Sequence, residues 1–329
     1  MRKIVVAVLV PPIHTTKPNP ASFPIAKAIS SLEQIGILTV FGFKLFSQNN
    51  TVWIDGSCVD NNGFTESKFK IDIIHDRFPS QIRYKHFQRL QLAAPKTLFG
   101  NPFSLTLLCR DKLRSQRLLE EHGCIFPEVI DAFDDFNEQL HTWGTGYIKP
   151  QFGSLGKGVA AVKPGMVLQS HVEGLVSGRL EPTLLQRGID APKGWKGMSV
   201  RQLMQRDIEG DWIPRTAVLR RSKNTPVVNV SKGAEAVPAE DFLPSDTIRS
   251  IQQQSLQACR ILSEVPDGLT AVEFGLDFVV ASDYRPWLIE VNSRPRGRLE
   301  ALTVRDPERF TLEHIHSCTQ PIRYLASLC

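Results

Sequence analysis

The sequence predicts a mixed fold, in which an amino-terminal α/β unit precedes a strand-rich α+β part. Strand-like and helix-like stretches alternate through residues 1–85, beginning with the apolar, β-branched run from Ile4 to Val10. Beyond residue 145, several strand-like stretches follow one another, which is typical of antiparallel sheets. The chain has 329 residues, of which 42% are hydrophobic and 22% charged. This is the composition of a globular protein with two or three packed units.

The amino-terminal unit combines one expected helix with several expected strands. Helical spacing of apolar residues over 23–36, with a glycine stop at Gly36, predicts the helix. Strand-like stretches follow at 37–43, 51–56 and 67–79. The turn sequences SQNN and DNNG separate them. Residues 86–102 resemble a linker with a short helix.

The rest of the chain is expected to contain four helices and a hairpin. Helices are predicted over 111–123, 134–144, 245–265 and 311–329, and a hairpin of two buried strands over 270–282 and 285–295. Five further stretches have the character of antiparallel strands: 158–165, 181–189, 198–207, 212–222 and 226–234. Successive strands separated by turns pair in antiparallel fashion, so this part of the chain is predicted to be α+β.

Charge and cysteine content limit the function classes. The net charge of +5 is mildly basic, and suits nucleotide phosphates or acidic substrates as well as nucleic acid. No basic patch interleaved with aromatic residues is present, so we expect no nucleic-acid partner. No stretch has the length of a membrane span, so we expect no membrane partner either. The six cysteines form no CxxC pair and no zinc spacing, which favours reduced thiols in a cytoplasmic protein.

The segment YIKPQFGSLGKGV, residues 147–159, is rich in glycine and has two lysines. Gly153, Gly156 and Gly158 can turn backbone N–H groups toward a polyphosphate, with Ser154 and Lys157 between them. The spacing differs from that of a Walker A loop, and a strand-like stretch follows where a Rossmann fingerprint requires a helix. Two alternatives remain at this point: a plain turn, or a glycine-rich hairpin that covers phosphates.

Two carboxylates and a carboxamide are expected close together on the hairpin of buried strands. Glu290 and Asn292 point to the same face of one strand because side chains alternate, and the partner strand can bring Asp277 beside them. Such hard oxygen ligands suit Mg²⁺. The alternative is a buried ion pair of Glu290 with Arg294 or Arg296, since an unpaired buried charge is costly.

Two lysines and one strand break are further candidates for a nucleotide site. Lys149 lies in an otherwise apolar strand directly before the glycine-rich segment, whereas Lys112 begins a helix. In LLQRGID, the strand breaks at Gly188 and exposes backbone groups near Gln186 and Ile189, which can bond an adenine edge. Surface lysines and a simple strand-to-turn boundary are the alternatives.

These elements, in this order, resemble the ATP-grasp superfamily of ligases, and especially its endospore-coat-associated YheC/YheD-like branch. The resemblance covers about residues 70–300, on the motifs DRFPS, FGNPFSLTLLCRDKLRSQRLL, YIKPQFGSLGKGV, LLQRGI, VVNVSKGA and LIEVNSRPRG. It implies an ATP-grasp fold, in which two α+β subdomains grip ATP behind an amino-terminal α/β domain. The implied domains are 1–98, a small subdomain 99–185 and a large subdomain 186–329.

The resemblance also implies a role for individual residues. Lys112 and Lys149 would contact the nucleotide, and Gly153 to Gly158 would form the mobile loop over its phosphates. The adenine hinge would comprise Gln186, Arg187 and Ile189. The Mg²⁺ ligands would be Asp277, Glu290 and Asn292. The catalytic cations near the transferred phosphate would be Arg201, Arg220 and Arg294. Asn229 would be a substrate-side or metal-side amide.

Ser199 and Ala234 depart from the family pattern, and this affects the expected acceptor or ribose site.

The activity that the resemblance implies is ATP-dependent ligation of a carboxylate to an amine through an acylphosphate, with release of ADP and phosphate. ATP and Mg²⁺ would be required, and the substrates would be small molecules or peptides that supply the carboxylate and the amine. A homodimer stays open. Two alternatives also stay open: an ATP-grasp kinase that stops after phosphoryl transfer, and a non-catalytic coat-type structural protein.

Overall fold

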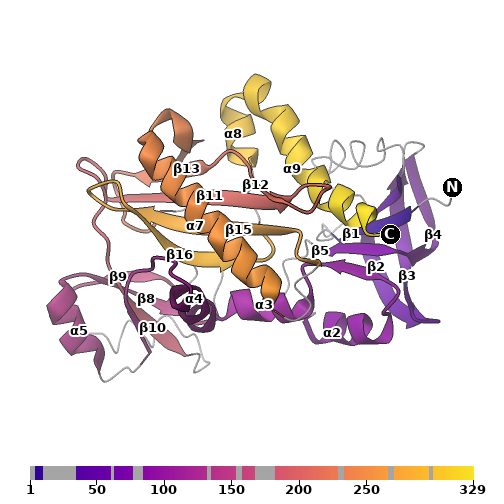
Figure 1. Ribbon diagram of the computed structural model, residues 1–329, viewed down its shortest axis with the longest axis horizontal. Helices are drawn as coiled ribbons and strands as arrows, with labels where there is room; N and C mark the ends of the chain where they lie inside the picture. Colours follow the sequence, from indigo (N-terminus) through magenta and orange to yellow (C-terminus); the bar gives the residue numbers. More distant parts are fainter. Residues whose placement is uncertain are drawn as a thin grey trace.

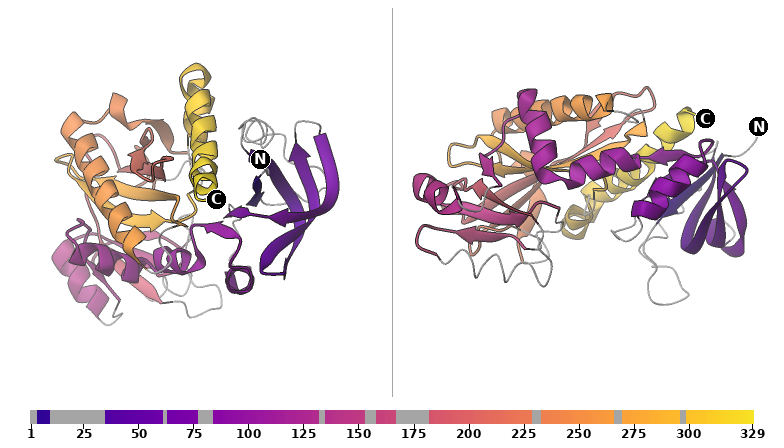
Figure 2. Two further views of the ribbon diagram at one scale, coloured as in Figure 1. Left: turned by 45° about the vertical axis from the view of Figure 1, so that its right-hand side comes forward. Right: turned by 90° about the horizontal axis from the view of Figure 1, so that it is seen from below.

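The computed structural model describes ten stretches of the chain: residues 4–9, 35–60, 63–76, 84–131, 135–152, 158–166, 182–228, 233–265, 270–295 and 299–329. Their strands form three sheets (Figure 1). The first sheet and the sheet of the small subdomain lie at opposite ends of the molecule, with the third sheet between them (Figure 2). This arrangement confirms the predicted mixture of an α/β unit with α+β parts. The expected helix at 23–36 lies outside the described residues, apart from its last two.

The amino-terminal sheet has parallel strands at its centre and an antiparallel meander at one side. Its strands, in spatial order, are β4 (Gly63–Ile71), β3 (Thr51–Asp60), β2 (Ile35–Gln48), β1 (Ile4–Leu9), β5 (Ile73–Asp76) and β6 (Leu98–Gly100). β1 pairs in parallel with β2 and β5. Helix α2 (Tyr84–Ala93) contributes Leu90 to a core that includes Ala7 and Ile74. β6 was expected to be part of a linker.

Asp72 divides the single strand expected over 67–79 into β4 and β5. The backbone N–H of Asp72 donates to the carbonyl of Val5, and the N–H of Val5 donates to a carboxylate oxygen of Asp72, both at 2.9 Å. The carbonyl of Asp72 accepts from the N–H of Leu98. At Asp72 the chain passes from β4, in the meander on one side of β1, to β5 on the other side. The prediction of one continuous strand was therefore wrong.

The small subdomain has a four-stranded antiparallel sheet with helices beside it. Its strands, in spatial order, are β7 (Val129–Ile130), β10 (Thr183–Arg187), β8 (Gly146–Pro150) and β9 (Ala160–Val162). The helices of this region are α3 (Phe103–Arg110), α4 (Lys112–Glu121) and α5 (Phe136–Trp143). Asp111 caps α4 by accepting from the N–H of Arg114, which separates α4 from the unpredicted α3. The boundary proposed after residue 185 falls within β10.

The large sheet has an apolar face and a polar face. Its strands, in spatial order, are β14 (Glu235–Pro238), β13 (Val218–Ser222), β11 (Gly197–Arg206), β15 (Glu273–Val280) and β16 (Pro286–Asn292), with β12 (Trp212–Pro214) also paired to β11. α7 (Ser245–Glu264) covers the apolar face, where Phe274, Leu276 and Phe278 are buried (Figure 1). Because side chains alternate along β15, Glu273 and Asp277 lie on the opposite face.

Two strand predictions in the large subdomain were wrong. Residues 212–222 form the two short strands β12 and β13, which both pair with β11 and are separated by residues 215–217; the N–H of Arg215 donates to the carbonyl of Leu203 in this interval. Residues 226 and 227, at the start of the strand expected over 226–234, form a bend, whereas residues 229–232 lie outside the described residues. The predicted hairpin exists as β15 and β16, with antiparallel pairing.

The carboxyl-terminal helices connect the large sheet to the amino-terminal sheet. They are α8 (Glu300–Arg305) and α9 (Pro307–Ser327). The end of α9 lies beside the first sheet (Figure 2), where Ile322 and Leu325 share a buried core with Val6 and Ile73. None of the helices in the described stretches is long and apolar enough to span a membrane.

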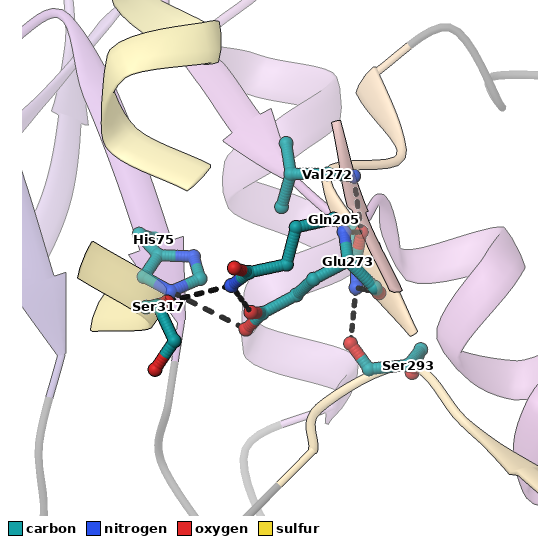
Figure 3. Close-up of polar contacts among 7 residues, drawn as sticks. His75, Gln205, Val272, Glu273, Ser293 and Ser317 are labelled. Carbon is teal, nitrogen blue, oxygen red and sulfur yellow. Dashed lines mark hydrogen bonds and ion pairs between the residues drawn. The ribbon is translucent and has the colours of Figure 1, made fainter. Parts of the chain in front are cut away.

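A buried polar cluster lies at the same junction (Figure 3). Nε2 of His75, on β5, is 3.6 Å from a carboxylate oxygen of Glu273, on β15. Gln205, on β11, donates to the other oxygen of Glu273 at 2.9 Å and to the carbonyl of Ser317 on α9 at 2.6 Å. Each of these groups is buried. The amino-terminal sheet thus contacts the polar face of the large sheet through His75 and Glu273, and Gln205 connects Glu273 to α9 through hydrogen bonds.

Candidate functional site

Two buried lysines from different elements lie close to one carboxylate. Lys112 is the first residue of α4, and Lys149 is on β8. Burial and the positive charge of Lys112 lower the pKa of Lys149 from 10.5 to about 7, although the carboxylate of Glu290 acts in the opposite direction. Lysines are seldom buried without a partner. A pair of buried ammonium groups is therefore a site suited to an anion.

Gln186 holds Lys149 in place. Its side-chain oxygen accepts from Nζ of Lys149 at 2.8 Å, and its amide nitrogen donates to Gln116 on α4 at 3.2 Å. No role is expected from the sequence for Gln116, which is buried and bonded to Gln186 on β10. The small subdomain thus presents a lysine and the expected hinge strand as one hydrogen-bonded unit.

The three expected metal ligands lie together on the hairpin. Asp277 on β15 is opposite Glu290 on β16, and Asn292 is opposite Gly275. The side-chain nitrogen of Asn292 donates to Asp277 at 3.1 Å. The register shifts directly after Asp277, and such bulges often redirect a side chain beside an active site.

Two arginines from neighbouring strands bind the Asp277 carboxylate. Arg201 on β11 donates through Nε at 2.6 Å and through Nη2 at 2.5 Å, and Arg220 on β13 donates through Nη2. Burial would raise the pKa of Asp277, but the two guanidinium groups lower it below its ordinary value. A buried ion pair on this hairpin is therefore found at Asp277, and it joins two of the expected catalytic cations to an expected metal ligand.

The oxygen atoms at this face fit a divalent cation. Carboxylate and amide oxygens are the ligands that Mg²⁺ accepts. In the described part of the chain, no group of three or more His, Cys, Asp or Glu side chains could hold a metal, so the site needs the amide of Asn292 beside Asp277 and Glu290. Asp277 already accepts from two arginines, and a cation must share or replace those bonds.

Gly275 leaves the space that Arg201 occupies. A Cβ atom at this position would lie 3.1 Å from Nη1 of Arg201 and 2.8 Å from Cβ of Pro295. A glycine inside a strand often marks such a close approach, and this signal was available in the sequence. The arginine can therefore extend along β15 to reach Asp277.

The remaining expected residues are dispersed. Gly153, Ser154, Gly156 and Lys157, together with Asn229, lie outside the described residues. Gly158 has φ +71°, a backbone conformation that favours glycine. The side chain of Arg187 is exposed and pairs with Glu128 at 3.1 Å, away from the lysines. Ile189 is half-buried beyond β10, and Arg294 is half-buried after β16.

The fold and the site together define the class. Two α+β subdomains, with buried lysines on one and paired carboxylates on the other, are the arrangement of the ATP-grasp fold. Among solved structures, similar ones include D-alanyl-alanine synthetase A from Vibrio cholerae O1 (TM-score 0.66, 12% identity, 98% of this chain and 99% of that chain). VanG D-Ala:D-Ser ligase from Enterococcus faecalis is also similar (TM-score 0.65, 12% identity, 98% and 100%). So is the D-alanine–D-alanine ligase from Bacillus anthracis complexed with ATP (TM-score 0.62, 15% identity, 99% and 97%).

The family follows from the sequence match. Residues 107–328 match the model of the YheC/D-like ATP-grasp family, which is more than half of the chain. The chain therefore belongs to the YheC/D-like ATP-grasp family. The search of curated proteins gave no match.

Proposed function

We propose that this protein is an ATP-dependent carboxylate–amine ligase that uses Mg²⁺ and forms an amide or peptide bond. The observation that supports the proposal is the proximity of Lys112 and Lys149 to the carboxylate of Glu290, which lies opposite Asp277 on the hairpin. Cations on one wall and oxygen ligands on the other suit a polyphosphate bound with a divalent cation. ATP is the nucleotide expected for this family.

The residues of the chain have distinct tasks in this proposal. Lys112 and Lys149 bind phosphate oxygens, and Arg201 and Arg220 offset the negative charge that develops during phosphoryl transfer. Asp277, Glu290 and Asn292 hold Mg²⁺, which neutralises phosphate charge when bound. The product of this first step is an acylphosphate, which an amine then attacks to release phosphate. Positioning and charge neutralisation are the main contributions that a protein makes to such a transfer.

The substrates are proposed to be a small-molecule or peptide carboxylate and an amine. The structures with the same fold include enzymes whose names state D-Ala–D-Ala, D-Ala–D-Ser and L-amino acid ligation, which favours amino-acid-like substrates. The five cysteines whose side chains are described have free thiols, and four of these side chains are buried. Free thiols suit a reducing compartment, and we propose the cytoplasm.

Glu290→Gln tests the proposal. We expect turnover of ATP to fall by about 10²–10³, the usual cost of removing one such charged group, while the fold is retained. Glu264→Gln, at the exposed end of α7, is the matched control and should leave turnover unchanged. Release of ADP and phosphate would be measured with pairs of amino acids or peptides as substrates. Normal turnover by Glu290→Gln would refute the site assignment.

A further outcome of this assay and one separate measurement distinguish the alternative functions. Formation of ADP and a phosphorylated substrate, without phosphate and without need of an amine, would identify a small-molecule kinase. Thermal unfolding with Mg-ATP tests the non-catalytic alternative, because ligand at about 100 times its Kd adds roughly 2.7 kcal/mol of stability. The absence of any shift at millimolar Mg-ATP would favour a structural protein.

A further inference from the structure

We propose that Gln116 is a positioning residue of the nucleotide site, which acts on Lys149 through Gln186. The inference rests on the proposed function and extends it to a residue on α4 that has no role among the expected site residues. The three side chains are buried together, with 2%, 5% and 6% of the surface of Gln116, Gln186 and Lys149 exposed. They come from α4, β10 and β8, so their contact also holds the helix against the sheet.

The direction of the hydrogen bonds is set by a backbone carbonyl. The carbonyl of Pro127 can only accept, so the group that faces it at 2.9 Å must be the amide nitrogen of Gln116. The amide oxygen of Gln116 then faces Gln186 and accepts from its nitrogen at 3.2 Å. The oxygen of Gln186 is consequently left to accept from Lys149 at 2.8 Å. An amide without such a neighbour can turn its nitrogen toward the ammonium, which would repel it.

The neutrality of this arrangement matters for a phosphate ligand. An amide oxygen orients the ammonium group without cancelling its charge, whereas a carboxylate would form an ion pair that a phosphate must replace. The charged groups that act on Lys149 are Lys112, which disfavours its protonated form, and Glu290, which favours it. The two glutamines thus orient the side chain of Lys149, and its positive charge stays available to an anion.

The chain offers a closely matched control for Gln116. Gln254, on α7, is also a buried helical glutamine, and its amide nitrogen also faces a proline carbonyl, that of Pro286. Its oxygen accepts from the backbone N–H of Ile125. Gln254 lies in the core beneath the apolar face of the large sheet, so its replacement should cost stability without affecting Lys149.

The test compares Gln116→Met with Gln254→Met in two measurements. In the protein without nucleotide, acetylation of Lys149 by acetic anhydride is followed by mass spectrometry as a function of pH. Gln116→Met should move the midpoint of this acetylation profile to lower pH, because the ammonium group loses a fixed hydrogen-bond acceptor. In calorimetry, Gln116→Met should weaken Mg-ADP binding about tenfold, the size of one hydrogen bond to a charged group. In a Lys149→Met background, the same replacement should have no further effect on affinity.

Each outcome decides the inference. A wild-type acetylation midpoint in Gln116→Met would overturn it, as would an equal effect of Gln116→Met with and without Lys149. If Gln254→Met moved the midpoint as far, the effect would be one of general stability, and the positioning role would be rejected. If the wild-type protein bound no Mg-ADP, the proposed function would fail, yet the acetylation midpoint would still decide whether Gln116 positions Lys149.

Discussion

Replacing Asn101 should destabilise the junction between the amino-terminal domain and the hairpin that contains the carboxylates. Asn101 directly follows β6 and has φ +55°, a left-handed conformation that asparagine tolerates better than most residues. Its side-chain oxygen accepts from the N–H of Val272 at 2.8 Å. Its side-chain nitrogen donates to the carbonyls of Glu273, at 2.7 Å, and Ser293. One buried side chain therefore satisfies backbone groups at the ends of both β15 and β16.

The magnitude follows from the groups left without a partner. Leaving a buried donor or acceptor unsatisfied costs roughly 1–3 kcal/mol, and Asn101→Ala removes the partner of one N–H and two carbonyls. We expect a loss of about 4 kcal/mol from these bonds, because the carbonyl oxygens retain a second lone pair. Alanine in the left-handed conformation adds roughly 1 kcal/mol. Asn101→Gly avoids that last cost and should be about 1 kcal/mol more stable than Asn101→Ala.

Urea-induced unfolding, followed by tryptophan fluorescence, measures these differences in the free energy of unfolding. Asn224→Ala, at an exposed position after β13, is the control and should stay within about 0.5 kcal/mol of the wild type. A loss below about 1 kcal/mol for Asn101→Ala would refute the reasoning, because that is the cost of a single unsatisfied group. Equal stability of the alanine and glycine variants would refute the part that concerns backbone conformation.

Two further predictions concern the site. Arg201→Met removes the side chain that donates two hydrogen bonds to Asp277, so the protein without nucleotide should bind Mn²⁺ more tightly. Electron paramagnetic resonance measures this affinity. Unchanged or weaker binding would contradict competition between the arginine and a cation. Because the pKa of Lys149 is about 7, this lysine is mostly neutral at pH 8, and a bound phosphate should raise its pKa. Binding of Mg-ADP should therefore take up protons at pH 8 and almost none at pH 6, measured by calorimetry in buffers of different ionisation enthalpy; equal uptake in Lys149→Met would assign the proton elsewhere.

The sequence predicted those parts of the site that depend on local periodicity. Glu290 and Asn292 share a face because side chains alternate in a strand, and a hairpin partner places Asp277 beside them. Lys149 was a candidate because a lysine in an apolar strand is unusual, and it is buried as that argument requires. Such inferences need only the residues of one or two adjacent strands.

The partners of these residues could not be predicted, because they come from distant parts of the chain. Arg201 is separated from Asp277 by 76 positions, and Gln186 from Gln116 by 70. A glutamine in an amphipathic helix such as α4 has no local feature that distinguishes it from a surface residue. The break at Asp72 was also missed, since it depends on a carboxylate that bonds to β1 rather than on a turn sequence.

The pairing of Asp277 with two arginines has a consequence for the order of binding. A cation that takes the Asp277 oxygens leaves Arg201 and Arg220 without their carboxylate, and both side chains are largely buried, with 16% and 18% exposed. Leaving a buried charge without its partner is strongly destabilising. A phosphate group that arrives with the cation would give the arginines a new anionic partner, whereas a cation alone would not. We therefore expect the wild-type site to bind cation and nucleotide together, and Arg201→Met to bind the cation without nucleotide, because the bonds from Arg201 to Asp277 no longer compete with the cation.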